Sequence, residues 1–142
     1  MTASRAKPLF MLDTNAVSDA VRCPQGDVAS RLAKLLPGQA VISVVVEGEL
    51  RYGIAKASTR TIERRVNALL ALIEVVSIDS AVARQYGVLR THLAVQGTPI
   101  GMNDLWIAAH ALELGLTLVT DNEVEFRRVP GLVVYNWQRD TA

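Results

Sequence analysis

The sequence predicts one α/β domain, a three-layer sandwich in which a central, mostly parallel sheet is flanked by helices. First, short apolar runs such as 9–12 and 116–119 alternate with longer segments of helical periodicity. Second, strands that alternate with helices form parallel sheets that are covered on both faces. Third, 142 residues, of which 50% are hydrophobic, suffice for one core. We therefore expect residues 1–142 to form a single domain.

Five short apolar runs are expected to form the strands of the sheet. Each run is bounded by turn or capping residues, which is the pattern of a strand buried on both faces. The expected strands are 9–12, 41–42, 75–78, 116–119 and 132–135.

Six helices are expected between these strands, because residues that cap or end helices mark their boundaries. Thr14 or Asn15 is expected to cap the first helix, and Asp27 the second. Ser43 is expected to cap the third, and Gly115 to end the sixth. The expected helices are about 14–21, 27–36, 44–57, 58–73, 80–96 and 102–114.

Composition and charge exclude several classes of protein. The apolar stretches are far shorter than the roughly 18 residues of a membrane span, and residues 1–8 do not resemble a signal peptide. The single cysteine, Cys23, favours a reducing cytoplasm. A net charge of +1 means that any RNA contact must come from local basic clusters, although surface solvation explains such charges as well. The basic residues in question are Lys56, Arg60, Arg64, Arg65, Arg127 and Arg128.

Carboxylates follow two of the expected strands. Asp13 comes directly after the first strand, and Asp121 comes one threonine after the fourth. Ligands on parallel sheets bind at the carboxyl ends of the strands, so we expect both side chains at the functional edge. Asp13 could instead serve only as a helix cap, but Thr14 and Asn15 offer alternatives for that role.

Two glutamates in the third expected helix have different neighbours. Glu47 has Arg51 four residues later, which is the favourable order for a surface ion pair. Glu49 has mainly apolar neighbours at helical spacing, where a carboxylate is costly unless a cation compensates it. We therefore expect Glu49 at the functional site and Glu47 at the surface.

Asp104 falls in the first turn of the sixth expected helix, where the helix dipole favours a carboxylate whatever its function. Asn103 is expected to cap that helix, and Gly101 permits another element to approach closely. Asp104 is then available as a third acid of the site.

Carboxylates gathered from separate parts of a chain repel one another unless a cation binds between them. Oxygen ligands select Mg²⁺ or Mn²⁺, and His92 and His110 lack the paired spacing of a zinc site. Mg²⁺ held by carboxylates polarises phosphoryl oxygens, which indicates hydrolysis of phosphodiesters. The expected catalytic residues and metal ligands are Asp13, Glu49, Asp104 and Asp121.

Several short motifs, taken in order, resemble the PIN-domain nucleases, and within them the VapC-type toxins of bacterial toxin–antitoxin pairs. The motifs are MLDTN (11–15), IS (42–43), ELRYG (49–53), PIGMNDLWIAAHA (99–111), LVT (118–120), EF (125–126) and VPGL (129–132), followed by Trp137. Each motif is weak alone, but their order is specific and covers almost the whole chain.

The resemblance implies a PIN-like fold and an endoribonuclease that depends on Mg²⁺ or Mn²⁺ and cuts particular RNAs, often tRNA. Asp13, Glu49 and Asp104 match the acidic positions of the family. The resemblance also implies a homodimer and a cognate VapB-like antitoxin. The antitoxin would cover a groove on the helical arm, which is the pair of expected helices 44–57 and 58–73. The groove residues would include Ile54, Ile62, Val66, Leu69 and Leu70, all of which core packing also explains.

The fourth acidic position departs from the family pattern. In many members the acid lies two residues after the threonine, where this chain has Asn122, so Asp121 comes one residue early. Glu125 is a second candidate, and Asn122 could hold a metal-bound water through its side-chain oxygen. Glu123 is expected to face water.

Two other classes of function compete with the nuclease. A phosphohydrolase would use Asp13 as a covalent nucleophile, but Asn15 stands where that class usually needs a second Asp. A binding module could keep the fold without the chemistry, although the presence of all three matching acids argues against it.

Overall fold

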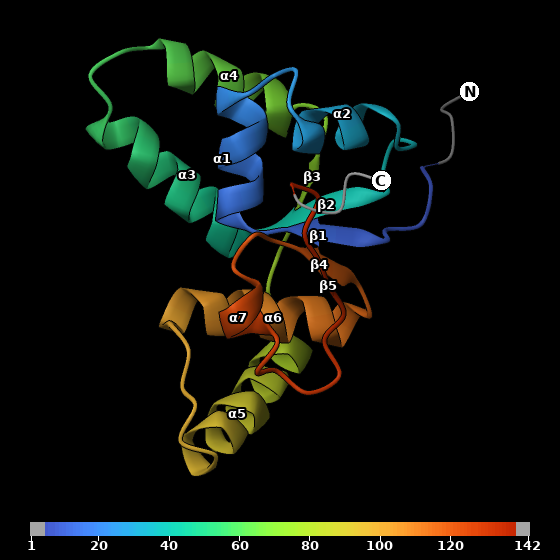
Figure 1. The fold of residues 1–142 in the computed structure, drawn as a ribbon, viewed down its shortest axis with the longest axis vertical. Coiled ribbons are helices and arrows are strands. Elements are labelled where there is room, and N and C mark those ends of the chain that lie inside the picture. The colour runs from blue at the N-terminus through green and yellow to red at the C-terminus, as the bar shows by residue number, and fades with distance from the viewer. Residues whose placement is uncertain (1–4, 139–142) are drawn as a thin grey trace.

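The computed structural model describes residues 5–138, which form a three-layer α/β sandwich (Figure 1). The order of the strands across the sheet is β3-β2-β1-β4-β5, and every neighbouring pair is parallel. The predicted fold class is therefore confirmed. The strands are β1 Phe10–Leu12, β2 Ala40–Ser43, β3 Glu74–Val76, β4 Thr117–Val119 and β5 Val134–Tyr135.

Helices cover both faces of this sheet (Figure 1). The six expected helices are present, with α2 and α4 shorter than expected, and α7 was not expected. On one side lie α1 Thr14–Arg22, α2 Asp27–Ala33, α3 Val44–Lys56 and α4 Thr61–Leu70, and on the other α5 Ser80–Val95, α6 Met102–Leu114 and α7 Glu123–Phe126. No helix among residues 5–138 is both long enough and apolar enough to cross a lipid bilayer.

The central strands form the middle of the core. Met11, Val41, Ile42 and Leu118 have no exposed surface, because helices cover both faces of the sheet. β1 lies between β2 and β4, and all three strands run in the same direction. The segments that follow these strands therefore leave the sheet at one common edge.

The prediction that Thr14 or Asn15 caps α1 is wrong. Asp13 caps this helix, since its Oδ1 accepts a hydrogen bond of 2.9 Å from the backbone N–H of Ala16. A carboxylate in this position satisfies a free backbone donor and interacts favourably with the helix dipole. Asp13 thus has a structural role in addition to any chemical one.

Two further caps differ from expectation. Asn103 does not cap α6, because that helix begins at Met102, with Gly101 in the capping position. Asp27 is the first residue of α2 and not its cap, which is Gly26. Ser43 does cap α3 as predicted, with its Oγ accepting a hydrogen bond of 3.1 Å from the backbone N–H of Val45.

Candidate active site

Asp13 is the most buried acid at the carboxyl edge of the sheet, with 3% of its surface exposed. Its Oδ2 accepts a hydrogen bond of 2.5 Å from the hydroxyl of Thr120, the residue that follows β4. Burial raises the pKa of Asp13 to about 6, and the negative charges of Asp121 and Asp104 raise it further, against the hydrogen bonds from Thr120 and Ala16. The two hydrogen bonds therefore offset only part of the cost of keeping Asp13 charged in this buried position.

Glu49 approaches the same edge from α3. It is half-buried, and its Oε1 accepts a hydrogen bond of 2.7 Å from the hydroxyl of Thr14, the first residue of α1. Polar contact with Thr14 thus replaces part of the apolar setting that the sequence suggests. Glu47 forms the expected ion pair with Arg51, at 3.7 Å, so the two glutamates are separated as predicted.

Asp104, in the first turn of α6, faces acids from two other helices. Burial raises the pKa of Asp104 to about 6, and the charges of Glu125 and Glu49 raise it further. A Cβ added to Gly101 would lie 3.6 Å from Asp104 Oδ2 and 3.8 Å from Glu125 Oε1. Gly101 therefore lies between these two carboxylates and leaves the space between them open.

The structure separates the two candidates for the fourth acid. Glu125 Oε1 accepts a hydrogen bond of 2.7 Å from the backbone N–H of Gly101, and its Oε2 accepts one of 2.8 Å from the Asn122 amide. These bonds lower the pKa of Glu125. Asp121 is exposed, and its charge acts on Asp13. Glu125 thus faces Asp104 inside the cluster, while Asp121 lies at its rim.

The short helix α7 explains why Glu123 does not face water, as was predicted. Glu123 is 8% exposed and accepts hydrogen bonds of 2.7 Å from Arg127 and 3.0 Å from the Asn136 amide. In a helical turn, residues three apart share a face, so Glu123 and Phe126 point inward together. The same turn directs Glu125 toward Gly101.

The two histidines lie apart from the acids. His92 is exposed in the last turn of α5. His110 is fully buried in α6, and its Nδ1 lies 2.9 Å from the Oγ of Ser43. This contact joins α6 to the beginning of α3 and so braces the helices that carry Asp104 and Glu49.

The charge of the cluster is left unbalanced. Among residues 5–138, no Lys or Arg side chain lies within 4.0 Å of the carboxylates of Asp13, Glu49 or Asp104. Within the same residues, no three His, Cys, Asp or Glu side chains are close enough to form a complete metal site. The acids thus influence one another's pKa without converging on one point. An all-oxygen donor set with unbalanced charge has the chemistry that a hard divalent cation requires.

The acidic cluster of this α/β protein lies at the carboxyl edge of its parallel sheet, which is where such sheets bind their ligands. The model of the PIN domain family matches residues 10–132 of this chain. The ribonuclease VapC2 of Rickettsia felis is 35% identical, over 92% of this chain and 99% of the relative. The tRNA(fMet)-specific endonuclease VapC of Shigella flexneri is 38% identical, over 90% and 97% of the two chains.

Solved structures give the same result. One is VapBC2 from Rickettsia felis bound to a DNA fragment from its promoter, with a TM-score of 0.84 and 34% identity, covering 91% of this chain and 98% of that one. Another is DNA-bound VapBC from Salmonella typhimurium, also with a TM-score of 0.84 and 34% identity, covering 92% and 98%. This chain belongs to the PIN domain family and, within it, to the VapC ribonucleases.

Proposed function

We propose that this chain is a cytoplasmic, divalent-metal-dependent endoribonuclease, the toxin of a toxin–antitoxin pair, which hydrolyses phosphodiester bonds in tRNA. The observation that carries this proposal is the meeting of Asp13, Glu49 and Asp104, from three separate segments, at one sheet edge without a balancing cation nearby. The names of the relatives, ribonuclease and tRNA(fMet)-specific endonuclease, support the same activity.

We assign Mg²⁺ to Asp13, Glu49 and Asp104, with Glu125 favoured over Asp121 as the fourth acid. Glu125 is favoured because its charge acts directly on Asp104, from across Gly101. Mn²⁺ has similar oxygen preferences and is the expected substitute. When bound, the divalent cation supplies a Lewis acid that polarises a phosphoryl oxygen.

The side chains of this site have separate duties in the proposed reaction. The hydroxyls of Thr120 and Thr14 orient the carboxylates of Asp13 and Glu49. Asp104 forms no side-chain hydrogen bond within residues 5–138, and its pKa is raised to about 6. Its two oxygens are therefore available to hold the divalent cation, whose positive charge would stabilise the ionised form of this carboxylate.

The geometry argues against Asp13 as a covalent nucleophile. Both of its oxygens accept hydrogen bonds, from Ala16 and Thr120, and almost none of its surface is exposed. Each oxygen keeps a second lone pair that can bind a small cation, but a covalent mechanism requires a bulky phosphoryl group to reach a side chain that is almost fully buried. Burial therefore favours the metal-binding role of Asp13 over the phosphohydrolase alternative.

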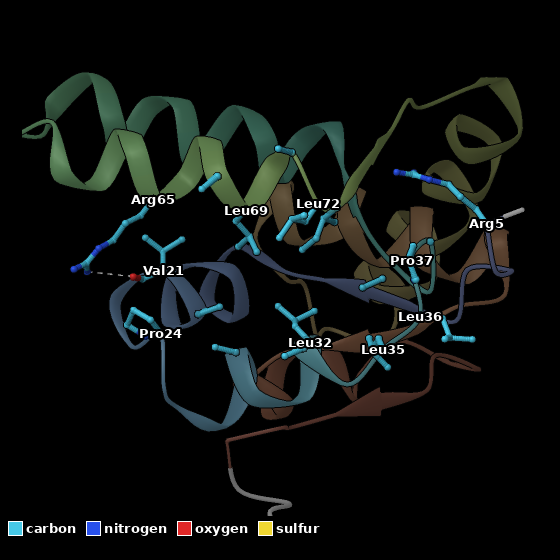
Figure 2. Close-up of a pocket in the computed structure, with 18 residues that line it drawn as sticks. Arg5, Val21, Pro24, Leu32, Leu35, Leu36, Pro37, Arg65, Leu69 and Leu72 are labelled. Atoms are coloured by element: carbon cyan, nitrogen blue, oxygen red, sulfur yellow. Dashed lines mark hydrogen bonds between the residues drawn. The ribbon is translucent and has the colours of Figure 1, made fainter. Parts of the chain in front are cut away.

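A VapB-like antitoxin is the proposed protein partner, and an apolar cavity of about 610 Å³ is its proposed site. The cavity lies between α4 and the pair α1 and α2, and Leu32, Leu35, Leu69 and Leu72 surround it (Figure 2). An apolar groove of this kind suits the apolar face of a helix. The solved structures of VapBC from other bacteria support this partner.

The groove differs from the one expected on the helical arm. Of the five arm residues named from the sequence, only Leu69 lines the cavity. Val66 is a core residue, and the others pack against the core. The implied homodimer stays a prediction.

Cleavage of a tRNA(fMet) transcript tests the proposed activity. We expect the purified protein to cut the transcript with Mg²⁺ and not with EDTA, and Asp104→Asn to cut it in neither condition. Equal cleavage in EDTA, or by Asp104→Asn, would overturn the metal assignment. The absence of cleavage of any tRNA by the parent protein in Mg²⁺ would overturn the proposed activity.

A further inference from the structure

A second groove, of about 410 Å³, adjoins the apolar cavity, with which it shares Leu35, and none of the proposed metal ligands lines it. It is bounded by α2 on one side and by β5 and the segment after β5 on the other. The residues that give it its character are Phe10, Ser30, Arg31, Lys34, Tyr135 and Trp137.

Aromatic rings form part of this groove. Phe10 and Trp137 pack edge to face, with their ring centroids 5.2 Å apart, and Trp137 is only 3% exposed. Tyr135, on the edge strand β5, keeps 48% of its surface exposed. An exposed ring beside a rigid aromatic contact is a platform on which a nucleic-acid base can stack.

Positive charge lines the opposite wall. Arg31 and Lys34 follow Asp27 by four and seven residues, so the three side chains share one face of the α2 segment. Among the residues that the structure describes, neither Arg31 nor Lys34 forms an ion pair or a side-chain hydrogen bond. The two cations exceed the single acid and are available to a phosphate.

One end of the groove, at Tyr135, lies near the acidic cluster, while its other end lies at Phe10, the first residue of β1. Leu12 is in register with Val119, and Val119 with Tyr135, so Tyr135 is two strand spacings, about 10 Å, across the sheet from the residue before Asp13. The carbonyl of Tyr135 also accepts a hydrogen bond of 2.9 Å from the backbone N–H of Thr120, whose hydroxyl binds Asp13. RNA held at the acids can therefore reach this groove.

We propose that the groove binds the RNA strand next to the scissile phosphate. One base stacks on Tyr135, and Arg31 and Lys34 contact the adjoining phosphates. This proposal rests on the proposed ribonuclease activity, and it adds the surface that holds the substrate outside the reacting centre.

Binding of a labelled tRNA(fMet) transcript tests the groove, with all variants made in the Asp104→Asn protein so that the RNA stays intact. We expect Tyr135→Leu to raise Kd about tenfold and Tyr135→Phe, which keeps the ring, to leave Kd near that of the parent. We expect the double change Arg31→Gln with Lys34→Gln to weaken binding and to reduce the slope of log Kd against log salt by about 1.5.

The matched control is Arg84→Gln with Arg90→Gln, which removes the same charge from α5 on the opposite side of the sheet (Figure 1). If this control changes Kd and the salt slope as much as the Arg31 and Lys34 pair does, the effect is one of net charge and the groove proposal is overturned. An unchanged Kd for Tyr135→Leu overturns it too. In both cases the proposed ribonuclease stands, provided that the protein with Asp104 intact still cuts tRNA; without that cleavage, the proposed function itself fails.

Discussion

The Thr14 hydroxyl donates a hydrogen bond of 2.7 Å to Glu49 Oε1, which joins the first residue of α1 to the middle of α3. The backbone places Thr14 directly after Asp13, so this single bond fixes the position of one acid relative to another. A hydrogen bond to a charged group contributes more than one between neutral groups, roughly 1.5–3 kcal/mol.

Thr14→Val tests that relationship, because valine keeps the shape of threonine and lacks only the hydroxyl. We expect kcat/KM for tRNA cleavage to fall about tenfold and the melting temperature to fall by several degrees, because the bond also contributes to stability. Thr14→Ser retains the donor and should keep most of the activity. Equal activity of the valine and serine variants would show that the bond has no part in orienting Glu49.

Glu49→Gln and Glu47→Gln form a matched pair on one helix. We expect the change at Glu49 to reduce cleavage by at least a hundredfold, because it removes a proposed metal ligand. The change at Glu47 breaks only a partly exposed ion pair with Arg51, which contributes roughly 0–1 kcal/mol. Cleavage rates for both variants, measured at saturating Mg²⁺, check this division, and similar losses in the two would contradict it.

The raised pKa of Asp13 predicts a pH-dependent stability in EDTA. Between pH 4 and pH 6 the unfolded chain loses this proton and the folded chain keeps it, so the free energy of unfolding decreases as pH rises through that range. The full loss, reached above pH 6, is about 3 kcal/mol for one buried group. Asp13→Asn should remove the part of this dependence that comes from Asp13, leaving the part that the raised pKa of Asp104 contributes, and should be more stable than the parent at pH 7. Urea melts from pH 4 to pH 8 measure it, and parallel curves for the two proteins would refute it.

Glu125→Gln and Asp121→Asn distinguish the two candidates for the fourth acid. We expect both to require more Mg²⁺ for half-maximal cleavage, and Glu125→Gln to require the larger increase, because Glu125 acts on Asp104 from within the cluster. Asp121→Asn should be less severe than Asp13→Asn or Asp104→Asn. Activity is titrated against Mg²⁺ for each variant, and a larger effect at Asp121 would return the role to that residue.

Leu72→Asp tests the proposed antitoxin groove. Leu72 lines the apolar cavity but is 74% exposed, so an aspartate there should leave the fold intact and weaken binding of the VapB-like partner at least tenfold. Val95→Asp, on α5, is the matched control because Val95 is 78% exposed and lies away from the cavity. Partner binding is measured by titration calorimetry, and equal effects of the two changes would argue against the groove.

The sequence by itself determined the order of strands and helices, because hydrophobic periodicity and capping residues are local properties of the chain. It also indicated Asp13 and Asp104 as candidate site residues, because Asp13 directly follows a buried strand and Asp104 lies in the first turn of a helix. The distinction between the roles of Glu47 and Glu49 followed from helical spacing alone. The ion pair between Glu47 and Arg51 confirms the contact that was predicted for Glu47.

Only the tertiary structure decided which groups each acid contacts. Asp13 caps α1 and also binds Thr120, a residue 107 positions away, and no local pattern predicts that bond. The α7 helix has only four residues, too few to show a helical period, so the sequence predicted neither the buried position of Glu123 nor the position of Glu125 against Gly101. Packing of α7 against the sheet edge fixes both side chains, because a single helical turn depends for its orientation on long-range contacts rather than on its own sequence.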